Sequence, residues 1–256
     1  MKAPVVFITG ASSGIGAALA RHYAAQGALL GLAARRGDAL AELARTLPTQ
    51  SFVYPLDVTD AAALSQAGAD FIARAGAPDI VIANAGVSVG TLTEAAEDAS
   101  SFEQVLRTNV VGLMHTFHPF VAAMRAAGRG RLVGIASVAG IRGLPGAGAY
   151  CASKAAAIAY LESLRVELRG SGIRVVTIAP GYIATPMTAP NPYPMPFILT
   201  AAEAACRMAR VIAAGRSYAV VPWQMTIVAK LLRLLPNALF DRLFARAGRK
   251  PRGLKL

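Results

Sequence analysis

Residues 5–16 read Val-Val-Phe-Ile-Thr-Gly-Ala-Ser-Ser-Gly-Ile-Gly, and they indicate the architecture of the whole chain. A short apolar run of strand length enters a glycine-rich turn, and a helix-length stretch rich in alanine follows. Glycines in such a turn let the backbone approach a pyrophosphate, and the N-terminus of the next helix favours its negative charge. The spacing is Gly-x3-Gly-x-Gly instead of the commoner Gly-x-Gly-x2-Gly, so the prediction of a dinucleotide site depends on this mechanism. The residues predicted to contact the dinucleotide here are Gly10, Ser12, Ser13, Gly14, Ile15 and Gly16.

The same alternation of apolar runs and alanine-rich stretches continues along the chain, which is typical of βαβ units. We therefore predict an α/β protein with a Rossmann-type, doubly wound parallel sheet of seven strands. The predicted strands are Val5–Thr9, Leu29–Ala33, Ser51–Pro55, Ile80–Asn84, Arg131–Ala136, Arg174–Ala179 and Tyr218–Val221. Predicted helices lie near 14–26, 38–46, 60–75, 100–126, 149–170 and 201–214.

Two regions depart from this alternation. Residues 186–196 contain five prolines, which forbid a regular helix or a central strand, so a loop is predicted there. After Pro222, apolar residues recur at helical spacing over 223–235 and 238–247, which predicts two short amphipathic helices. We expect a nucleotide-binding catalytic domain over residues 1–222 and a basic helical extension over residues 223–256.

Length and composition favour a single globular domain. Of 256 residues, 55% are hydrophobic and 16% are charged, which is unlike a disordered chain. The first apolar run stops at Thr9 and is too short for a signal peptide or a membrane span, so a cytoplasmic protein is expected. Cys151 and Cys206 lack metal-ligand spacing, so both are predicted to be reduced and structural, and no metal site is predicted.

Positive charge is concentrated at the C-terminal end. The net charge is +12, and residues 223–256 carry eight basic residues against Asp241 alone. An amphipathic basic element can contact an anionic membrane, cover the substrate cleft or a partner subunit, or remain a solvated tail, and the sequence leaves these alternatives open. Nucleic-acid binding is not expected, because the basic residues are interleaved with Leu and Phe.

Tyr150 and Lys154 stand one helical turn apart in Tyr-Cys-Ala-Ser-Lys. Residues four apart share a helix face, so the lysine can reach the region of the phenol. A phenol with a pKa of about 10 is a poor proton donor or acceptor near neutrality, and a nearby ammonium is expected to lower that pKa. Ser137 offers a hydroxyl that can hydrogen-bond a reacting oxygen.

These motifs together resemble the short-chain dehydrogenase/reductase family over most of residues 5–221. Besides the glycine turn, the resemblance includes Asp57-Val58, Asn84-Ala85-Gly86, Asn109, Ser137, Tyr150-x3-Lys154 and Pro180-Gly181. It implies an enzyme in which Tyr150 is the general acid or base, Ser137 binds the carbonyl oxygen, Lys154 also binds the nicotinamide ribose, and Asn109 joins a proton relay. It also implies that Asp57 and Val58 border the adenine, that Asn84, Ala85 and Gly86 support the cofactor, and that Pro180, Gly181, Ile183 and Thr185 lie by the nicotinamide. A non-enzymatic NADP(H)-binding regulatory protein with the same fold is the alternative.

The second strand ends at Ala33-Ala34-Arg35-Arg36, where relatives that prefer NAD usually carry an acid. An acid there would repel a 2′-phosphate, whereas an arginine fork can bind it. We therefore predict NADP(H), with Arg35 as the main phosphate contact and Arg36 as a second. The alternative is that both are solvated turn residues.

The substrate is expected to be a small hydrophobic carbonyl compound or alcohol. The segment after Pro180-Gly181 carries Tyr182, Met187, Tyr193, Met195 and Phe197, which would form an apolar lid. The C-terminal end resembles the branch of the family that contains 3-ketodihydrosphingosine reductases and other lipid or steroid reductases. The family resemblance also implies a homo-oligomer, with a dimer formed through the helices near 100–126 and 149–170, and the tail suggests peripheral contact with a membrane.

Overall fold

The computed structural model describes residues 3–253. Residues 1–2 and 254–256 lie outside the described residues, as does Lys255 of the basic extension. Seven parallel strands form one sheet in the order β3-β2-β1-β4-β5-β6-β9. The strands are β1 (Val5–Thr9), β2 (Leu29–Ala34), β3 (Ser51–Pro55), β4 (Ile80–Ala83), β5 (Gly130–Ile135), β6 (Ile173–Pro180) and β9 (Tyr218–Val221). The predicted Rossmann-type sheet is confirmed.

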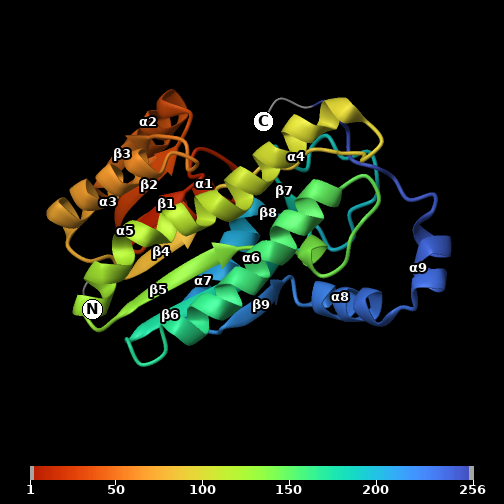
Figure 1. Cartoon of the computed structure of the whole chain (residues 1–256). Coiled ribbons are helices and arrows are strands. Elements are labelled where there is room, and N and C mark those ends of the chain that lie inside the picture. The colour runs from red at the N-terminus through yellow and green to blue at the C-terminus, as the bar shows by residue number, and fades with distance from the viewer. Residues whose placement is uncertain (1–2, 254–256) are drawn as a thin grey trace.

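Helices cover both faces of the sheet (Figure 1). One face packs against α1 (Gly14–Ala24), α2 (Gly37–Thr46) and α7 (Ala201–Ala214). The other packs against α3 (Ala61–Ala75), α5 (Gly112–Ala126) and α6 (Gly148–Glu167), and α4 (Ala99–Leu106) lies beside α6. Because both faces are covered, the central strands β1 and β4 are buried along their whole length and almost entirely apolar, whereas the edge strands β3 and β9 are partly exposed.

Alternation along β1 shows how one strand serves two cores. Val6 and Ile8 belong to the cluster with α1 and α7, whereas Phe7 belongs to the opposite cluster. The Phe7 ring centroid lies 5.3 Å from that of Phe71 and 4.8 Å from that of Phe120. Gly31 on β2 leaves the space for these rings, since a Cβ there would lie 2.9 Å from the Phe71 ring.

The prediction of one continuous α-helix near 100–126 is wrong. The backbone forms α4, then a π-helical segment over Arg107–Val111, then α5. A π-helical turn inserts one residue into the helix, and hydrophobic periodicity does not reveal it in a single sequence. Asn109 lies inside this segment, so the insertion changes the direction of a predicted site residue.

The proline-rich loop is confirmed, because residues 186–196 contain no helix or strand. The segments on either side of this loop pair with each other as β7 (Ile183–Ala184) and β8 (Leu199–Thr200). Two-residue strands carry no alternation, so the sequence did not predict them.

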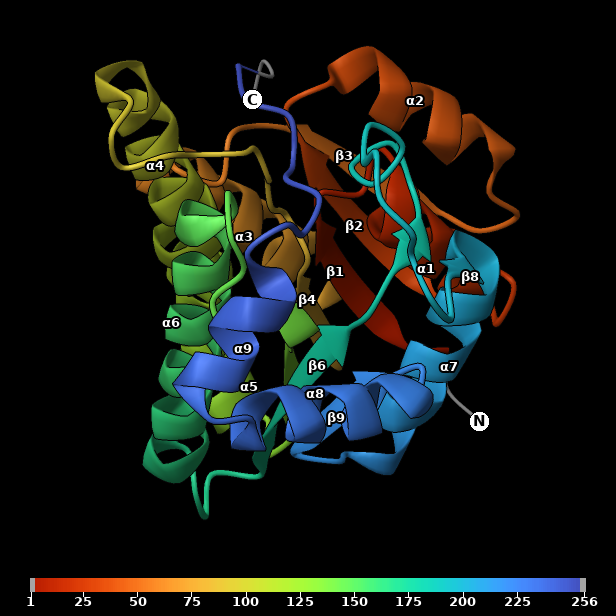
Figure 2. The same ribbon diagram turned by 90° about the vertical axis from the view of Figure 1, so that its right-hand side faces the viewer.

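The predicted extension forms α8 (Gln224–Leu234) and α9 (Asn237–Phe244). Figure 2 shows the chain after α9 running back across the molecule toward α4. Within residues 3–253, no helix is long and apolar enough to cross a membrane.

Candidate active site

The glycine turn between β1 and α1 brings backbone segments too close for side chains. Gly10 has φ of +66°, and a Cβ there would lie 2.8 Å from the Ala85 Cα. Gly14 has φ of +53°, and its Cβ would lie 3.2 Å from the Thr185 side chain. Gly16 packs directly on the Gly10 carbonyl. The turn therefore presents bare backbone at the carboxyl end of β1, where a phosphate can approach.

Asn84 holds this turn in place from the end of β4. Its Nδ2 donates to the carbonyl oxygens of Thr9 at 3.0 Å and Gly10 at 3.2 Å. In return, Thr9 Oγ1 accepts hydrogen bonds from the backbone N–H of Asn84 at 3.2 Å and of Ala85 at 3.3 Å. The predicted role of Asn84 as a support for the cofactor strand thus has a structural basis in these bonds.

A cavity of about 560 Å³ follows the carboxyl edge of the sheet, and every predicted cofactor residue except Gly16 lines it. The cavity reaches from Arg35 and Arg36 at the end of β2 to Ser137 and Tyr150. Gly16 lies beneath the turn instead. The lining also includes Met187 of the predicted apolar lid. Residues that the sequence interpretation missed are Ala34, Leu56, Val87, Ser88, Thr108, Ile135, Ala136, Pro186, Thr188 and Pro190. Most adjoin a predicted residue in the sequence, so proximity to the motifs would have found them.

The residues present fit a nicotinamide dinucleotide. Ser13 is the N-cap residue of α1 but does not cap it with its side chain, so the hydroxyl stays available beside the unpaired N–H groups of the first turn. The Arg36 Nη2 donates to Ser12 Oγ at 3.1 Å, and the Arg35 Nη1 lies 4.0 Å from Asp57 Oδ2. Arg35 and Arg36 both line the cavity at the end of β2.

Tyr150 and Lys154 project from α6 toward the end of β5. Lys154 Nζ lies 5.8 Å from the centroid of the Tyr150 ring and donates a hydrogen bond to the Ile135 carbonyl at 2.8 Å. Ser137 follows β5 directly, and its Oγ accepts from the Ala139 N–H at 3.1 Å. The three side chains thus meet at one place along the cavity.

The predicted lowering of the Tyr150 pKa by Lys154 is wrong for this geometry. Burial raises the pKa of the Tyr150 hydroxyl, and hydrogen bonding with Ser137 partly opposes that rise. Burial also lowers the pKa of Lys154 to about 8, so the ammonium is still mostly protonated at neutral pH. The sequence could not show this result, because the depth of burial and the bond from Lys154 to a backbone carbonyl depend on the fold.

Asn109 connects the loop after β4 to α6. Its Oδ1 accepts from the Val87 N–H at 2.8 Å, and its Nδ2 donates to the Val87 carbonyl and to Ser153 Oγ, each at 2.9 Å. Ser153 Oγ in turn donates to the Tyr150 carbonyl at 2.8 Å. A Cβ on Gly86 would lie 3.1 Å from Asn109 Oδ1 and 3.5 Å from Lys154 Nζ, so Asn109 is close to the lysine although it does not line the cavity.

A doubly wound parallel sheet with this cavity and a tyrosine–lysine pair beside it defines a nucleotide-dependent oxidoreductase of Rossmann type. A family model described as short chain dehydrogenase matches residues 4–194. An uncharacterized oxidoreductase of Myxococcus xanthus is 38% identical over 244 residues, which cover 94% of this chain and 96% of that protein. The chain belongs to the short-chain dehydrogenase/reductase family.

Two further comparisons bear on the cofactor. A protein of a Sphingomonas species, named 2-dehydro-3-deoxy-L-rhamnonate dehydrogenase (NAD(+)), is 37% identical over 180 residues, 70% of this chain and 72% of that one. Among solved structures, an alcohol dehydrogenase from the archaeon Thermococcus sibiricus, complexed with 5-hydroxy-NADP, matches with a TM-score of 0.75 and 26% identity, covering 85% of this chain and 95% of that chain. The chain is thus an oxidoreductase whose fold binds a nicotinamide cofactor, and its family acts on small-molecule carbonyl or alcohol groups.

Proposed function

We propose that this protein is an NADPH-dependent reductase that converts a hydrophobic, lipid-like ketone to an alcohol. The observation that carries the proposal is the cavity itself, because it joins two arginines at the end of β2 to Ser137, Tyr150 and Lys154. A cytoplasmic location and membership of the lipid and steroid branch remain predictions from the sequence.

A bound nicotinamide supplies the hydride that reduces the carbonyl carbon. The protein supplies the rest of the chemistry. Ser137 hydrogen-bonds the carbonyl oxygen, and Tyr150 gives that oxygen its hydroxyl proton as negative charge develops on it. Because burial raises its pKa, Tyr150 is protonated at neutral pH, which is the state a general acid needs. Lys154 contributes positive charge beside the resulting tyrosinate, and Asn109 holds the loop after β4 and α6 together.

The preference for NADPH over NADH is supported by the charge at the β2 end of the cavity. Arg35 and Arg36 present two guanidinium groups there, and these are suited to a 2′-phosphate. The nearest carboxylate, Asp57, lies 4.0 Å from Arg35 and accepts hydrogen bonds from the Thr59 N–H and hydroxyl, each at 2.9 Å, through its other oxygen. One relative is named for NAD(+) and one structural neighbour is complexed with 5-hydroxy-NADP, so the two arginines carry this part of the proposal.

The hydrophobic substrate is supported by the side chains that follow β6. The rings of Tyr182 and Tyr193 lie 6.4 Å apart, edge to face, and Met187 lines the cavity. Burial raises the pKa of Tyr193 to about 12, and the nearby Tyr182 and Tyr150 hydroxyls add to that rise. Together, Tyr182 and Tyr193 form an apolar surface in the loop after β6 that also carries Met187.

The test is NADPH oxidation by the purified protein with ketones of increasing chain length in detergent micelles. Turnover that rises with chain length is the expected result, because each buried CH₂ contributes about 0.8 kcal/mol to binding. The Tyr150→Phe variant is the blank. Activity confined to small, polar ketones would contradict the lipid-like substrate, and oxidation of NADH alone would contradict the cofactor assignment.

Peripheral contact with an anionic membrane is a second part of the proposal. Trp223, Ile227, Leu231 and Leu234 lie on one side of α8 and are 65%, 53%, 58% and 79% exposed, whereas Met225 and Ala229 are buried. Lys230 and Arg233 are also exposed on this helix. Replacing Trp223, Ile227 and Leu231 by serine should abolish sedimentation with vesicles of phosphatidylcholine and phosphatidylglycerol, because the apolar face would be lost. Undiminished sedimentation would contradict membrane contact.

The proposed homodimer would use the surface formed by α4, α5 and α6. Phe102, Val111, Met114 and Val166 are exposed apolar residues on α4, the π-helical segment, α5 and α6. Such residues support a protein interface rather than a solvated surface. Light scattering should give twice the mass of one chain, and substituting Met114 and Val166 by glutamate should give monomers. A wild-type monomer would contradict this part of the proposal.

A further inference from the structure

After α9, residues 248–252 contact the catalytic domain at several points. Residues 248–252, called here the 248–252 segment, cross the loops that follow β4, β5 and β6 (Figure 2). In a parallel sheet, loops at the carboxyl ends of the strands surround the bound substrate. A segment that touches three such loops is placed to shape that site.

Contacts with the loop after β6 come first. Gly248 packs on Tyr193, since a Cβ on this glycine would lie 2.9 Å from the Tyr193 Cβ. Lys250 is only 8% exposed, and its Nζ donates to the Met187 carbonyl at 3.1 Å. Tyr193 and Met187 are the residues that support the apolar substrate site, so the segment lies directly behind that site.

The loop after β5 holds both the segment and the helices before it. A Cβ on Gly146 would lie 3.0 Å from the Arg249 Cβ. Arg142 donates to the Leu235 carbonyl at 2.6 Å and to Asn237 Oδ1 at 3.0 Å, and its guanidinium lies 4.0 Å from the centroid of the Phe240 ring. These contacts fix α8 and α9 against the loop that begins at Ser137.

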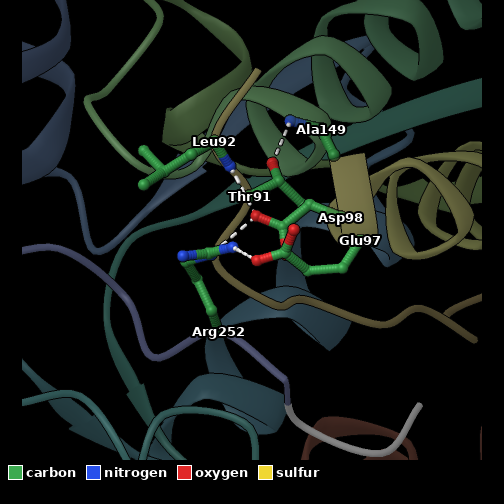
Figure 3. A network of polar contacts seen from close by, with 6 residues as sticks. All are labelled: Thr91, Leu92, Glu97, Asp98, Ala149 and Arg252. Carbon is green, nitrogen blue, oxygen red and sulfur yellow. Dashed lines mark hydrogen bonds and ion pairs between the residues drawn. The ribbon is translucent and has the colours of Figure 1, made fainter. Parts of the chain in front are cut away.

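The loop after β4 completes the attachment. The Gly90 N–H donates to the Pro251 carbonyl at 2.9 Å, and Gly90 has no side chain to obstruct the Lys250 carbonyl beside it. Arg252 Nε donates to Asp98 Oδ2 at 2.7 Å, and its Nη2 donates to Glu97 Oε1 at 2.6 Å (Figure 3). Hydrogen bonds from Arg252 and from the Leu92 N–H lower the pKa of the Asp98 carboxyl, so this partner is charged at neutral pH.

The same loop is bonded to the helix that carries Tyr150. Thr91 Oγ1 accepts from the Ala149 N–H at 3.3 Å, and Thr91 precedes Leu92, whose N–H donates to Asp98 (Figure 3). Loss of the Arg252 side chain would therefore disturb the loop after β4, which is hydrogen-bonded to the start of α6.

We propose that the 248–252 segment is the outer wall of the substrate site and determines which ketones the enzyme accepts, with Arg252 as the residue that positions it. The proposal rests on the proposed function and deepens it. Arg252 acts through the wall rather than on the reacting atoms, so its loss should affect substrate affinity and leave cofactor binding unchanged. The 248–252 segment does not itself line the cavity, so it acts on the substrate end through Met187, Tyr193 and the loops that it holds in place.

The experiment compares wild type, Arg252→Met and Arg246→Met on the full chain. Arg246 is an exposed arginine outside the segment and is the matched control. KM and kcat are measured with NADPH across the ketone series, and the Kd for NADPH is measured by nucleotide fluorescence. Calorimetry gives the affinity of the NADP⁺-loaded protein for the longest ketone, and hydrogen exchange reports on the Gly90 region.

Arg252→Met should raise KM and the calorimetric Kd for the longest ketone about tenfold, which corresponds to about 1.4 kcal/mol. Its kcat for the smallest ketone and its Kd for NADPH should match those of the control, and exchange around Gly90 should be faster. An unchanged ketone profile together with faster exchange would overturn the proposal. If wild-type protein binds the ketones without reducing them, only the proposed function is refuted. The calorimetric Kd values of wild type and Arg252→Met would still test whether the segment shapes the substrate site. Wild-type protein that neither binds nor reduces them would overturn both.

Discussion

The cofactor end and the substrate end of the cavity are built in different ways. At the cofactor end, the turn between β1 and α1 is a continuous stretch of sequence, and a single side chain, Asn84, secures it from the next strand. At the substrate end, three loops are joined by a segment that lies 63 residues beyond Met187 and 154 residues beyond Asp98 in the chain. The cofactor end is therefore formed mainly by residues close together in the sequence, whereas the substrate end depends on contacts between residues far apart in the sequence. Mutations should therefore affect the two ends separately.

The largest effect is expected where the two ends meet, at Tyr150. Tyr150→Phe removes the proton donor, and loss of a general acid costs about 10²–10⁴-fold in rate. The Kd for NADPH should stay within a factor of about two, because the ring and its packing are kept. Single-turnover kinetics and nucleotide fluorescence measure the two quantities.

Tyr160→Phe is the matched control, since Tyr160 lies on the same helix and is half-buried. It should keep wild-type turnover. Normal turnover by Tyr150→Phe would contradict the role of Tyr150 as the general acid, and with it the proposed mechanism.

A smaller effect, confined to the cofactor end, is expected at Arg35. Arg35→Ala should weaken NADPH binding about tenfold to a hundredfold, because hydrogen bonds to charged groups contribute about 1.5–3 kcal/mol. Affinity for NADH, which lacks the 2′-phosphate, should barely change. KM for the ketone should also be unchanged if the two ends are independent.

Arg45→Ala is the control for this experiment, because Arg45 is an exposed arginine on α2 that pairs with Glu42. Equal losses of NADPH and NADH affinity in Arg35→Ala would mean that the arginine supports the fold of the site rather than the phosphate.

The contrast also explains what could be predicted from the sequence. The strands, the glycine turn and the Tyr150–Lys154 pair are local patterns, and the structure places them where periodicity and spacing predict. The π-helical segment around Asn109, the pairing of β7 with β8 and the path of residues 245–253 depend on contacts between distant residues. Arg252 has no motif around it, and its partners Glu97 and Asp98 carry no signal that identifies them. A single sequence cannot show such a pairing.

The smallest expected effect tests whether the 248–252 segment is part of the folded domain. Burial lowers the pKa of Lys250 to about 8, whereas an unfolded lysine titrates near 10.4. Between these values the unfolded chain holds more protons at this site than the folded chain does. The free energy of unfolding of wild type should therefore rise with pH in that window relative to Lys250→Met, by at most about 1.4 kcal/mol per pH unit.

Chemical denaturation of both proteins at several values between about pH 7.5 and pH 10.5, a range that brackets the two pKa values, measures this difference. Other titrating groups cancel in the comparison, since both proteins contain them. The charges nearest the lysine in the segment are Arg249 and Arg252, and Arg252 is paired with Glu97 and Asp98. Hydrogen bonds raise the pKa of Arg252 and lower the pKa values of Glu97 and Asp98, so these three groups keep their charge across this window while Lys250 changes. A difference in unfolding free energy that does not vary with pH would mean that Lys250 is solvated and that the 248–252 segment does not pack on the domain. The substrate end would then lack the long-range contacts that distinguish it from the cofactor end.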